Sequence, residues 1–235
     1  MSLSYGQFCP VAITSEILCT RWTTLVVREL MSGSTRFNQI RRGVPLMSPS
    51  LLSKRLTELS DHGVVQKKYV KGNIVEYHLS AAGRELIPII ESFGTWGKRW
   101  FNSEVNLNKL DALLLMWDVH RLIKPEAISL KSCVVEFNFP ELSSKKRRHW
   151  IVISQNDVNY CIVDPGLDTD LLITSSVRVL TSIHMGYSNF EDEVNQGLLV
   201  IRGNPQLAKA MSQWLGRSPF AGVPQQTPQL NYGYG

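Results

Sequence analysis

The chain has 235 residues, of which 43% are apolar, so its length and composition favour two packed domains. Its longest apolar runs are far shorter than the ~20 residues that span a bilayer, and its N-terminus lacks a signal-peptide pattern. We therefore expect a cytoplasmic protein with no membrane partner. Its four cysteines show no C-x-x-C spacing, which argues against a zinc site or a disulfide framework, and we expect neither a metal nor a cofactor.

The basic charge of the chain is confined to its first half. Residues 1–103 hold 13 Lys and Arg against 7 Asp and Glu, a formal charge of +6, whereas residues 104–235 hold 12 against 13. This asymmetry indicates that the first half binds a polyanion. A solvated basic surface would carry the same charge, so the pattern of the residues has to decide between the two interpretations.

Three helices are predicted in the first half. Apolar residues recur at steps of three and four over residues 14–31, and a second, short helix fits residues 36–42. Ser48 is suited to be the N-cap of a third helix, with Pro49 at the first helical position, where its missing N–H costs nothing.

The third helix pairs an apolar stripe with a polar face. At about 100° per residue, Leu52, Leu56 and Leu59 lie on one side, and Ser50 and Lys54 lie roughly opposite. A helix anchored by leucines and presenting hydroxyls and a lysine can enter a major groove. An ordinary amphipathic surface helix would show the same stripe, so this helix alone does not settle the matter.

A β-hairpin is predicted directly after this helix. Residues 63–70 and 74–80 are rich in β-formers, and the residues between them suit a tight reversal. Lys67, Lys68 and Lys71 place positive charge on the first strand and at the tip. A cationic hairpin beside a helix-turn-helix is a winged helix, in which helix and wing contact one duplex. The predicted DNA-contacting residues are Arg36, Ser48, Ser50, Leu51, Ser53, Lys54, Arg55, Lys68 and Lys71.

The first domain resembles the HxlR-type winged helix-turn-helix transcription regulators. The resemblance is carried by CPVAITSEILCTRWTTLVVREL (residues 9–30), RFNQIRRGVPLMSPSLLSKRLTELSDHGVV (36–65) and VEYHLSAAGRELIPIIESFGTWGKRW (75–100). The family often has a proline at the wing tip, where this chain has Lys71, Gly72 and Asn73. The resemblance implies a homodimer that binds paired half-sites on double-stranded DNA and represses or activates nearby genes.

Residues 85–101 form a predicted helix with more apolar surface than one small domain needs. Together with the resemblance, this favours a shared dimer interface over a helix that packs only on its own chain. The residues predicted to form this interface are Leu86, Ile90, Phe93, Gly97 and Trp100.

Cys9 has two interpretations. In some relatives of this family a cysteine in this Cys-Pro position senses electrophiles or oxidants, which requires an accessible and reactive thiol. A buried and inert cysteine is the alternative, and the sequence favours it because no histidine lies nearby.

A second domain is predicted after a polar linker at residues 102–109. A helix over residues 109–123 precedes four strands, at 133–140, 149–155, 159–165 and 169–176; a helix to Met185, a helix at 190–196, a strand at 198–204 and a closing helix at 205–215 follow. This order predicts an α+β chain with a meander sheet. The expected domains are residues 1–103 and 110–223, followed by a disordered tail at 224–235.

Residues 170–216 resemble the C-terminal half of sterol carrier protein-like lipid-binding domains. The resemblance implies an α/β domain with an antiparallel or mixed sheet, covered by helices around an apolar tunnel that would hold an apolar or lipid-like effector. A plain core would use the same residue types. The candidate lining residues are Phe137, Phe139, Trp150, Ile183, Met185, Met211 and Trp214.

No catalytic pattern is present among the common ones: the sequence contains no H-E-x-x-H, G-x-S-x-G or P-loop, and its five histidines are scattered singly. We therefore do not expect an enzyme. The sequence favours a homodimeric DNA-binding regulator that an apolar ligand of the second domain modulates. A regulator that responds to electrophiles through Cys9 and a lipid-binding carrier protein are the alternatives.

Overall fold

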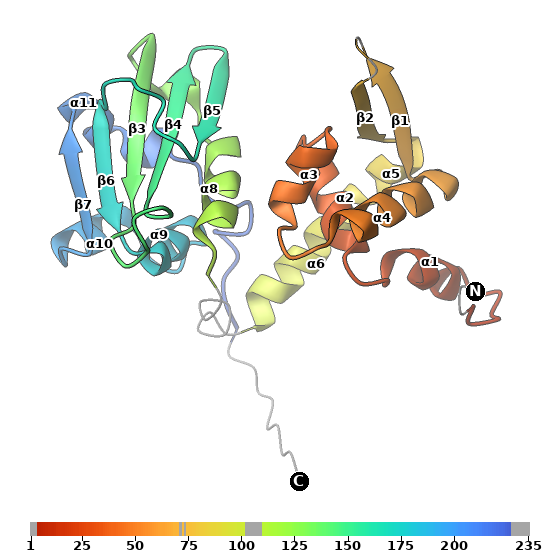
Figure 1. Cartoon of the computed structure of the whole chain (residues 1–235). Helices are drawn as coiled ribbons and strands as arrows, with labels where there is room; N and C mark the ends of the chain where they lie inside the picture. The colour runs from red at the N-terminus through yellow and green to blue at the C-terminus, as the bar shows by residue number, and fades with distance from the viewer. Residues whose placement is uncertain (1–3, 71, 73, 102–109, 227–235) are drawn as a thin grey trace. The chain divides into compact units, whose positions relative to one another are not determined.

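The computed structural model describes residues 4–70, 72, 74–101 and 110–226, and its contacts divide the chain into two units, Met1–Gly94 and Thr95–Gly235 (Figure 1). The division falls inside a helix, so the domain limits expected from the sequence stay predictions. The predicted linker at 102–109 lies outside the described residues. Among the described helices, none has the length and apolar character needed to cross a membrane.

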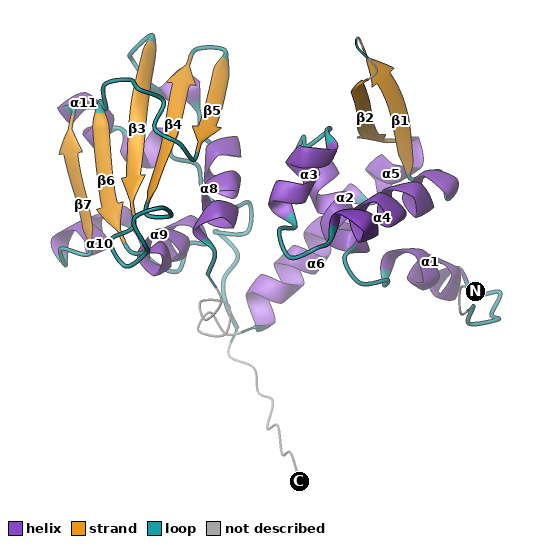
Figure 2. Cartoon of the chain, viewed as in Figure 1, coloured by secondary structure: helices purple, strands orange, loops and turns teal. Residues whose placement is uncertain are grey.

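The first unit is a winged helix-turn-helix. Four helices precede a two-stranded antiparallel hairpin, and two helices follow it (Figure 2). The elements are α1 (Pro10–Leu18), α2 (Thr23–Met31), α3 (Phe37–Gly43), α4 (Pro49–Asp61), β1 (Val65–Val70), β2 (Ile74–Leu79), α5 (Ala81–Glu85) and α6 (Ile87–Trp100).

The single helix predicted at residues 14–31 is wrong, because two helices, α1 and α2, occupy this part of the chain. The break lies at Trp22, whose φ of 78° is in the left-handed region that side chains with a Cβ rarely adopt. A residue in that conformation cannot continue a right-handed helix, so α2 starts afresh at Thr23.

The core of the first unit is built around the predicted leucine stripe of α4. Leu52, Leu56 and Leu59 are at most 1% exposed, and they share one cluster with Val26 of α2 and Ile40 of α3. The amphipathic character predicted for α4 is therefore confirmed, and the helix is fixed to the unit along one side.

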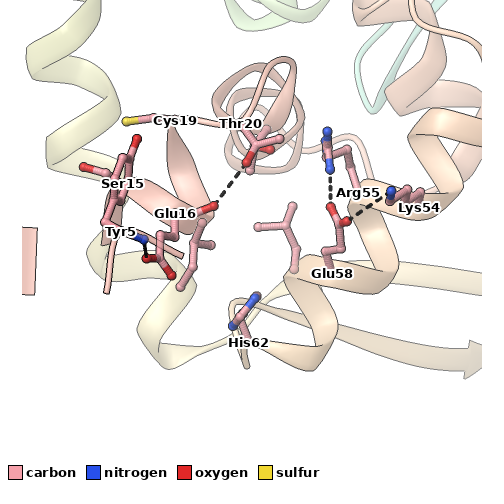
Figure 3. A pocket seen from close by; sticks show the side chains of 12 residues that line it. Tyr5, Ser15, Glu16, Cys19, Thr20, Lys54, Arg55, Glu58 and His62 are labelled. Carbon is pink, nitrogen blue, oxygen red and sulfur yellow. Dashed lines mark hydrogen bonds and ion pairs between the residues drawn. The ribbon is translucent and has the colours of Figure 1, made fainter. Parts of the chain in front are cut away.

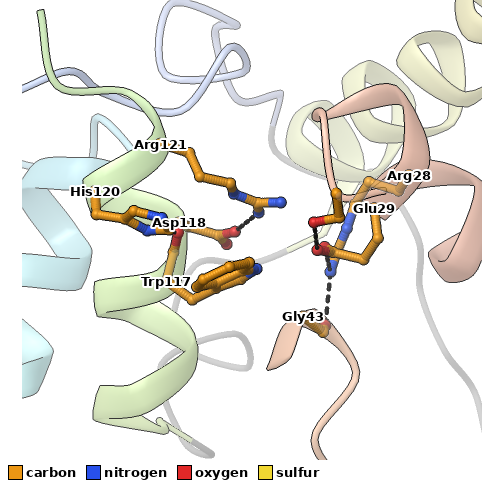
Figure 4. A network of polar contacts seen from close by, with 8 residues as sticks. Arg28, Glu29, Gly43, Trp117, Asp118, His120 and Arg121 are labelled. Carbon is orange, nitrogen blue, oxygen red and sulfur yellow. Dashed lines mark hydrogen bonds and ion pairs between the residues drawn. The ribbon is translucent and has the colours of Figure 1, made fainter. Parts of the chain in front are cut away.

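A buried acid joins α2 to α3. The carboxylate of Glu29 accepts hydrogen bonds from Arg28 Nη2 at 2.9 Å and from Ser34 Oγ at 3.3 Å, and the same guanidinium donates to the carbonyl of Gly43 at 3.0 Å (Figure 4). A Cβ at Gly43 would collide with the carboxylate of Glu29, so only glycine fits at the end of α3.

The second unit is a five-stranded sheet with helices. Its elements are α8 (Ala112–Arg121), a 3-10 turn at Pro125–Ala127, β3 (Ser132–Asn138), β4 (Arg148–Ser154), β5 (Asp157–Cys161), β6 (Leu171–Ser175), α9 (Val177–His184), α10 (Phe190–Asn195), β7 (Leu199–Gly203), α11 (Pro205–Lys209) and α12 (Met211–Trp214). The closing helix predicted at 205–215 is thus two short helices.

The sheet is mixed and not a simple meander, which corrects the predicted strand order. The strands lie in the order β5-β4-β3-β6-β7, and β6 runs parallel to β3 while every other pair is antiparallel. Asp170 fixes the return of the chain beside β3: its backbone N–H donates to the carbonyl of Val134, and its carboxylate accepts from the N–H of Val134 at 2.8 Å.

One face of this sheet forms the core with the helices. Alternate residues of the strands, among them Val135, Phe137, Ile151 and Ile173, are at most 1% exposed. They share one cluster with apolar residues of α8, α9, α11 and α12. The mixed α+β class predicted for the chain is confirmed.

Candidate nucleic-acid interface

The first turn of α4 is exposed and polar. Ser48 is the N-cap, as predicted, and its Oγ accepts from the N–H of Leu51 at 3.3 Å while lying 3.2 Å from Ser50 Oγ. Ser50 and Ser53 are exposed, and Leu51 is half-buried against the core. The helix therefore offers hydroxyl groups at its N-terminus, where the helix dipole also favours an anion.

Lys54 and Arg55 are neighbours on α4 with different surroundings. The side chain of Lys54 is 67% exposed, 3.9 Å from Glu58, whereas that of Arg55 is only 13% exposed. Arg55 donates through Nε to the carbonyl of Arg21 at 3.3 Å and pairs with Glu58. Lys54 can thus reach a phosphate, and Arg55 mainly ties α4 to the segment that precedes α2.

The wing presents its cations along β1. Lys67 and Lys68 are exposed, and Lys68 lies opposite Glu76 of β2 in the antiparallel register. Gly72 turns the chain with a φ of 79°, in the region that favours glycine. Lys71, the tip residue predicted to contact DNA, lies outside the described residues.

Arg36 connects the helix-turn-helix to the wing. It is the N-cap of α3, and its Nε lies 3.7 Å from a carboxylate oxygen of Glu76, which also contacts His78 Nε2 at 3.1 Å. The carbonyl of the preceding residue, Thr35, accepts from the N–H of Tyr77 at 2.7 Å. Because α3 is held to β2 in this way, the wing keeps a fixed position relative to α4.

Three residues that the sequence reasoning did not single out lie exposed at the end of α3 and in the connection to α4. Arg41 and Arg42 form the last turn of α3, and Leu46, which is 85% exposed, follows in the connection to α4. The adjacent arginines before a Gly-x-Pro turn were the available signal. The two arginines add positive charge next to the exposed start of α4.

The structure separates the predicted dimer residues into two groups. Ile90 is buried in the core of its own unit and Leu86 packs against that core, whereas Phe93 and Trp100 are exposed. Gly97 is half-buried, with open space where a Cβ would point. The role of these residues in a dimer stays a prediction.

Cys9 is half-buried and is the N-cap residue of α1. Its side chain makes no capping hydrogen bond there. Its role as a thiol sensor stays a prediction. Cys133, by contrast, is buried in the sheet, and burial raises the pKa of its thiol to about 11, so it is protonated at neutral pH.

Most of the residues predicted to line a ligand tunnel are core residues. Five of the seven belong to the single buried cluster of the second unit, each at most 2% exposed: Phe137, Phe139, Ile183, Met211 and Trp214. Trp150 is buried outside that cluster, and Met185 is half-buried. Met211 also lines a groove of about 560 Å³ with Phe190, Val194, Ile201 and Ala208. The tunnel itself stays a prediction.

Two buried histidines of the second unit are uncharged at neutral pH. Burial lowers the pKa of His149 and of His184 below the ordinary value. Nε2 of His149 lies 3.0 Å from the carbonyl of Lys146 and therefore carries the proton, so Nδ1 accepts from the hydroxyl of Tyr160 at 2.7 Å. Among the described residues, no cluster of three His, Cys, Asp or Glu side chains is arranged to hold a metal ion.

Comparisons with known proteins concern the N-terminal part of the chain. Residues 17–105 match the HxlR-like helix-turn-helix family. The uncharacterized HTH-type transcriptional regulator YvaP of Bacillus subtilis is 34% identical over 103 residues, which cover 43% of this chain and 95% of that protein. The uncharacterized HTH-type transcriptional regulator sll1512 of Synechocystis is 34% identical over 102 residues, which cover 42% of this chain and 75% of that protein.

Two solved structures are also similar. The redox regulator HypR in its oxidized form is 32% identical, and the match covers 38% of this chain and 95% of that chain, with a TM-score of 0.37. The reduced form of the transcriptional regulator YodB from Bacillus subtilis is 27% identical, and the match covers 39% of this chain and 93% of that chain, with a TM-score of 0.35.

Ser48 and Ser53 give a prediction about how much the N-cap of α4 stabilises the fold. Ser48→Ala removes the acceptor for the N–H of Leu51 and should lower the free energy of unfolding by about 1 kcal/mol. Ser53→Ala, on the exposed face within the helix, should leave that free energy unchanged or raise it slightly, because alanine is the better helix former. Chemical denaturation of both variants measures the difference, and equal losses would contradict the capping role.

Proposed function

The chain belongs to the HxlR-like helix-turn-helix family, and from this premise we propose that it regulates transcription by binding specific duplex DNA as a homodimer. The observation that carries the proposal is the exposed polar face of α4, fixed to the unit by its buried leucine stripe and standing beside a cationic wing. Hydroxyls and a lysine on such a face can bond base edges, and the wing lysines can bond phosphates.

An apolar stripe on α6 supports the homodimer. Ile89, Phe93, Trp96 and Trp100 are all between 37% and 57% exposed, and they follow one another at steps of four, three and four. These steps are the a and d spacing of a helix that packs against another helix. The residues of α6 that face the core of the first unit, Ile87 and Ile90, lie beside this stripe and not within it.

The N-terminal segment adds a second apolar surface. Phe8 is 98% exposed, and Val11 and Ile13 of α1 are also exposed. Val11 and Ile13 lie about 200° apart around α1, so a partner that covers both would have to enclose this segment and not pack on one face of it. A second copy of the chain would cover such a surface on both partners at once, as the two-fold symmetry of a dimer requires.

For the second unit we propose the binding of an apolar effector. The groove that Phe190, Val194, Ile201, Ala208 and Met211 line has a volume of about 560 Å³, within the range of small-molecule sites of about 300–1,000 Å³. This groove is a better candidate than the tunnel positions, because those side chains are already packed in the core.

Helix α6 is the proposed route by which an effector would change DNA binding. Its last residues belong to the second unit: the ammonium of Lys98 lies 3.2 Å from the centre of the Tyr187 ring, and the N–H of Gln226 donates to the carbonyl of Arg99. Burial lowers the pKa of Lys98 to about 8. An effector that changes these contacts of Lys98 and Arg99 would move α6, which also carries the apolar stripe of the proposed dimer.

DNA binding should be steep in salt, because cationic contacts release counterions from the phosphates. On an operator obtained by in vitro selection, Lys54→Ala should weaken specific binding by about 1–3 kcal/mol and relax the preference for the operator over random DNA. Lys68→Ala should weaken binding to both DNAs about equally and lower the salt slope by about one. Titrations by fluorescence anisotropy at several salt concentrations measure this, and identical behaviour of the two variants would contradict the assigned roles.

The dimer depends on the α6 stripe in this proposal. Phe93→Asp places a charge in the middle of the stripe, where burial against a second helix would leave it unpaired, so the variant should be monomeric. Val163→Asp changes an exposed apolar residue of the second unit and should leave the dimer intact. Sedimentation velocity gives the mass of each variant, and a dimeric Phe93→Asp protein would place the interface elsewhere.

The effector groove can be tested with a fluorescent fatty acid. Ala208→Trp fills the groove and should abolish binding of this probe, while Gln213→Trp, on an exposed position of α12 outside the groove, should bind it as the unmodified chain does. Saturation with the probe should change operator affinity of the unmodified chain about 5 to 150 fold. Binding that survives in Ala208→Trp would exclude this groove as the site.

A further inference from the structure

A pocket of about 430 Å³ lies between α1 and the recognition helix α4 (Figure 3). Ser15 and Glu16 of α1 and its C-cap residue Cys19 line one side of it, and Lys54 and Glu58 of α4 line the other. The remaining lining residues are Tyr5, Ile17, Thr20, Thr23, Arg55, Leu59 and His62. The volume lies within the range of small-molecule sites.

The pocket contains a buried hydroxyl without a partner. Thr23 is 2% exposed, and its Oγ1 has no hydrogen-bond partner among the described residues. A buried polar group without a partner costs about 1–3 kcal/mol, so a partner from outside the chain, such as a ligand, would be stabilised by this hydroxyl. Thr23 follows the left-handed residue Trp22, which sets the start of α2 and so the position of this hydroxyl.

The donors of the pocket exceed what its own acceptors use. Arg55 donates from Nε to the carbonyl of Arg21 and from Nη1 to the carboxylate of Glu58, so the N–H groups of its Nη2 remain available. The carboxylate of Glu58 also forms an ion pair with Lys54. The carboxylate of Glu16 accepts from Ser4 Oγ at 2.9 Å and from the N–H of Tyr5 at 2.5 Å. Both acids are therefore occupied.

We propose that this pocket binds a small organic carboxylate as an effector of DNA binding. Its carboxylate would accept from the guanidinium of Arg55 and from the hydroxyl of Thr23, and its apolar part would lie against Ile17 and Leu59. The regulatory half of this inference rests on the proposed function, because the ligand acts on the helix that reads DNA.

The position of the pocket explains how such a ligand acts. Arg55 now joins α4 to the segment after α1 through the carbonyl of Arg21, and it pairs with Glu58 on its own helix. A carboxylate in the pocket binds the remaining N–H groups of this guanidinium and fills the space between the two helices. The ligand therefore changes the orientation of α4 relative to α1, and with it the direction in which Lys54 extends.

Three probes of one size and different charge test the ligand chemistry: benzoate, benzamide and benzylamine. In the unmodified full chain without DNA, benzoate should bind saturably and shift the amide NMR signals of α1 and α4, benzamide should bind more weakly, and benzylamine should not bind. Thr23→Val keeps the shape of the side chain and removes the unpaired hydroxyl, so it should fold normally and bind benzoate about tenfold more weakly.

Thr57→Val is the matched control, because Thr57 is exposed on α4 and does not line the pocket. It should bind benzoate as the unmodified chain does. No saturable binding of benzoate, equal weakening in both threonine variants, or tighter binding of benzylamine would each overturn the carboxylate site.

The regulatory half is measured separately, as operator affinity of the unmodified chain with and without saturating benzoate. We expect a change of about 5 to 150 fold. An operator complex that forms normally and ignores bound benzoate would overturn the effector role while leaving the proposed DNA-binding function standing. A chain that binds benzoate and no duplex would instead overturn the proposed function.

Discussion

The burial of Leu52, Leu56 and Leu59 is the interaction on which the N-terminal unit depends. Each leucine side chain contributes about 1.5–3 kcal/mol by leaving water, and together they press one side of α4 onto α2 and α3. Because three residues of one stripe are fixed, the rotation of α4 about its axis is fixed too. The polar face then has one direction, outward, and a helix without this stripe could present any face to DNA.

The other contacts of the unit keep neighbouring elements in place around that helix. Glu29 and Arg28 tie the end of α3 to α2 inside the core, and Arg36 with Glu76 ties the start of α3 to the wing. Only Glu29 among these residues is fully buried, and because a buried charge is tolerated only when it is paired and hydrogen-bonded, its position admits few substitutions. The result is a helix and a hairpin that are held in one fixed arrangement.

Helix α6 has one side buried in the core of the first unit and one side exposed. Ile87 and Ile90 pack in the core of the first unit, while Phe93 and Trp96 are exposed. Its end is held within the second unit by Lys98 and by the chain around Gln226. Helix α6 therefore contributes residues to both units.

The sequence by itself determined the local features. Ser48 and Pro49 mark the start of α4, the spacing of its leucines marks its buried side, and the β-formers around Gly72 mark the wing, because capping, periodicity and turn chemistry act between near neighbours. The family follows from the same stretch of chain.

Tertiary structure alone decided what depends on distant residues. The left-handed turn at Trp22, which separates α1 from α2, rests on one residue's backbone angles, and apolar spacing does not encode them. The placement of β6 beside β3 follows from long-range pairing. The period-two pattern of a strand shows which of its faces is buried, but it does not show which strand lies next to it. Arg55 turned inward because the carbonyl of Arg21, 34 positions earlier in the chain, lies within its reach. The helical period places Arg55 nearer the leucine stripe than Lys54, but only the packing of the neighbouring segment decides that Arg55 binds the carbonyl of Arg21.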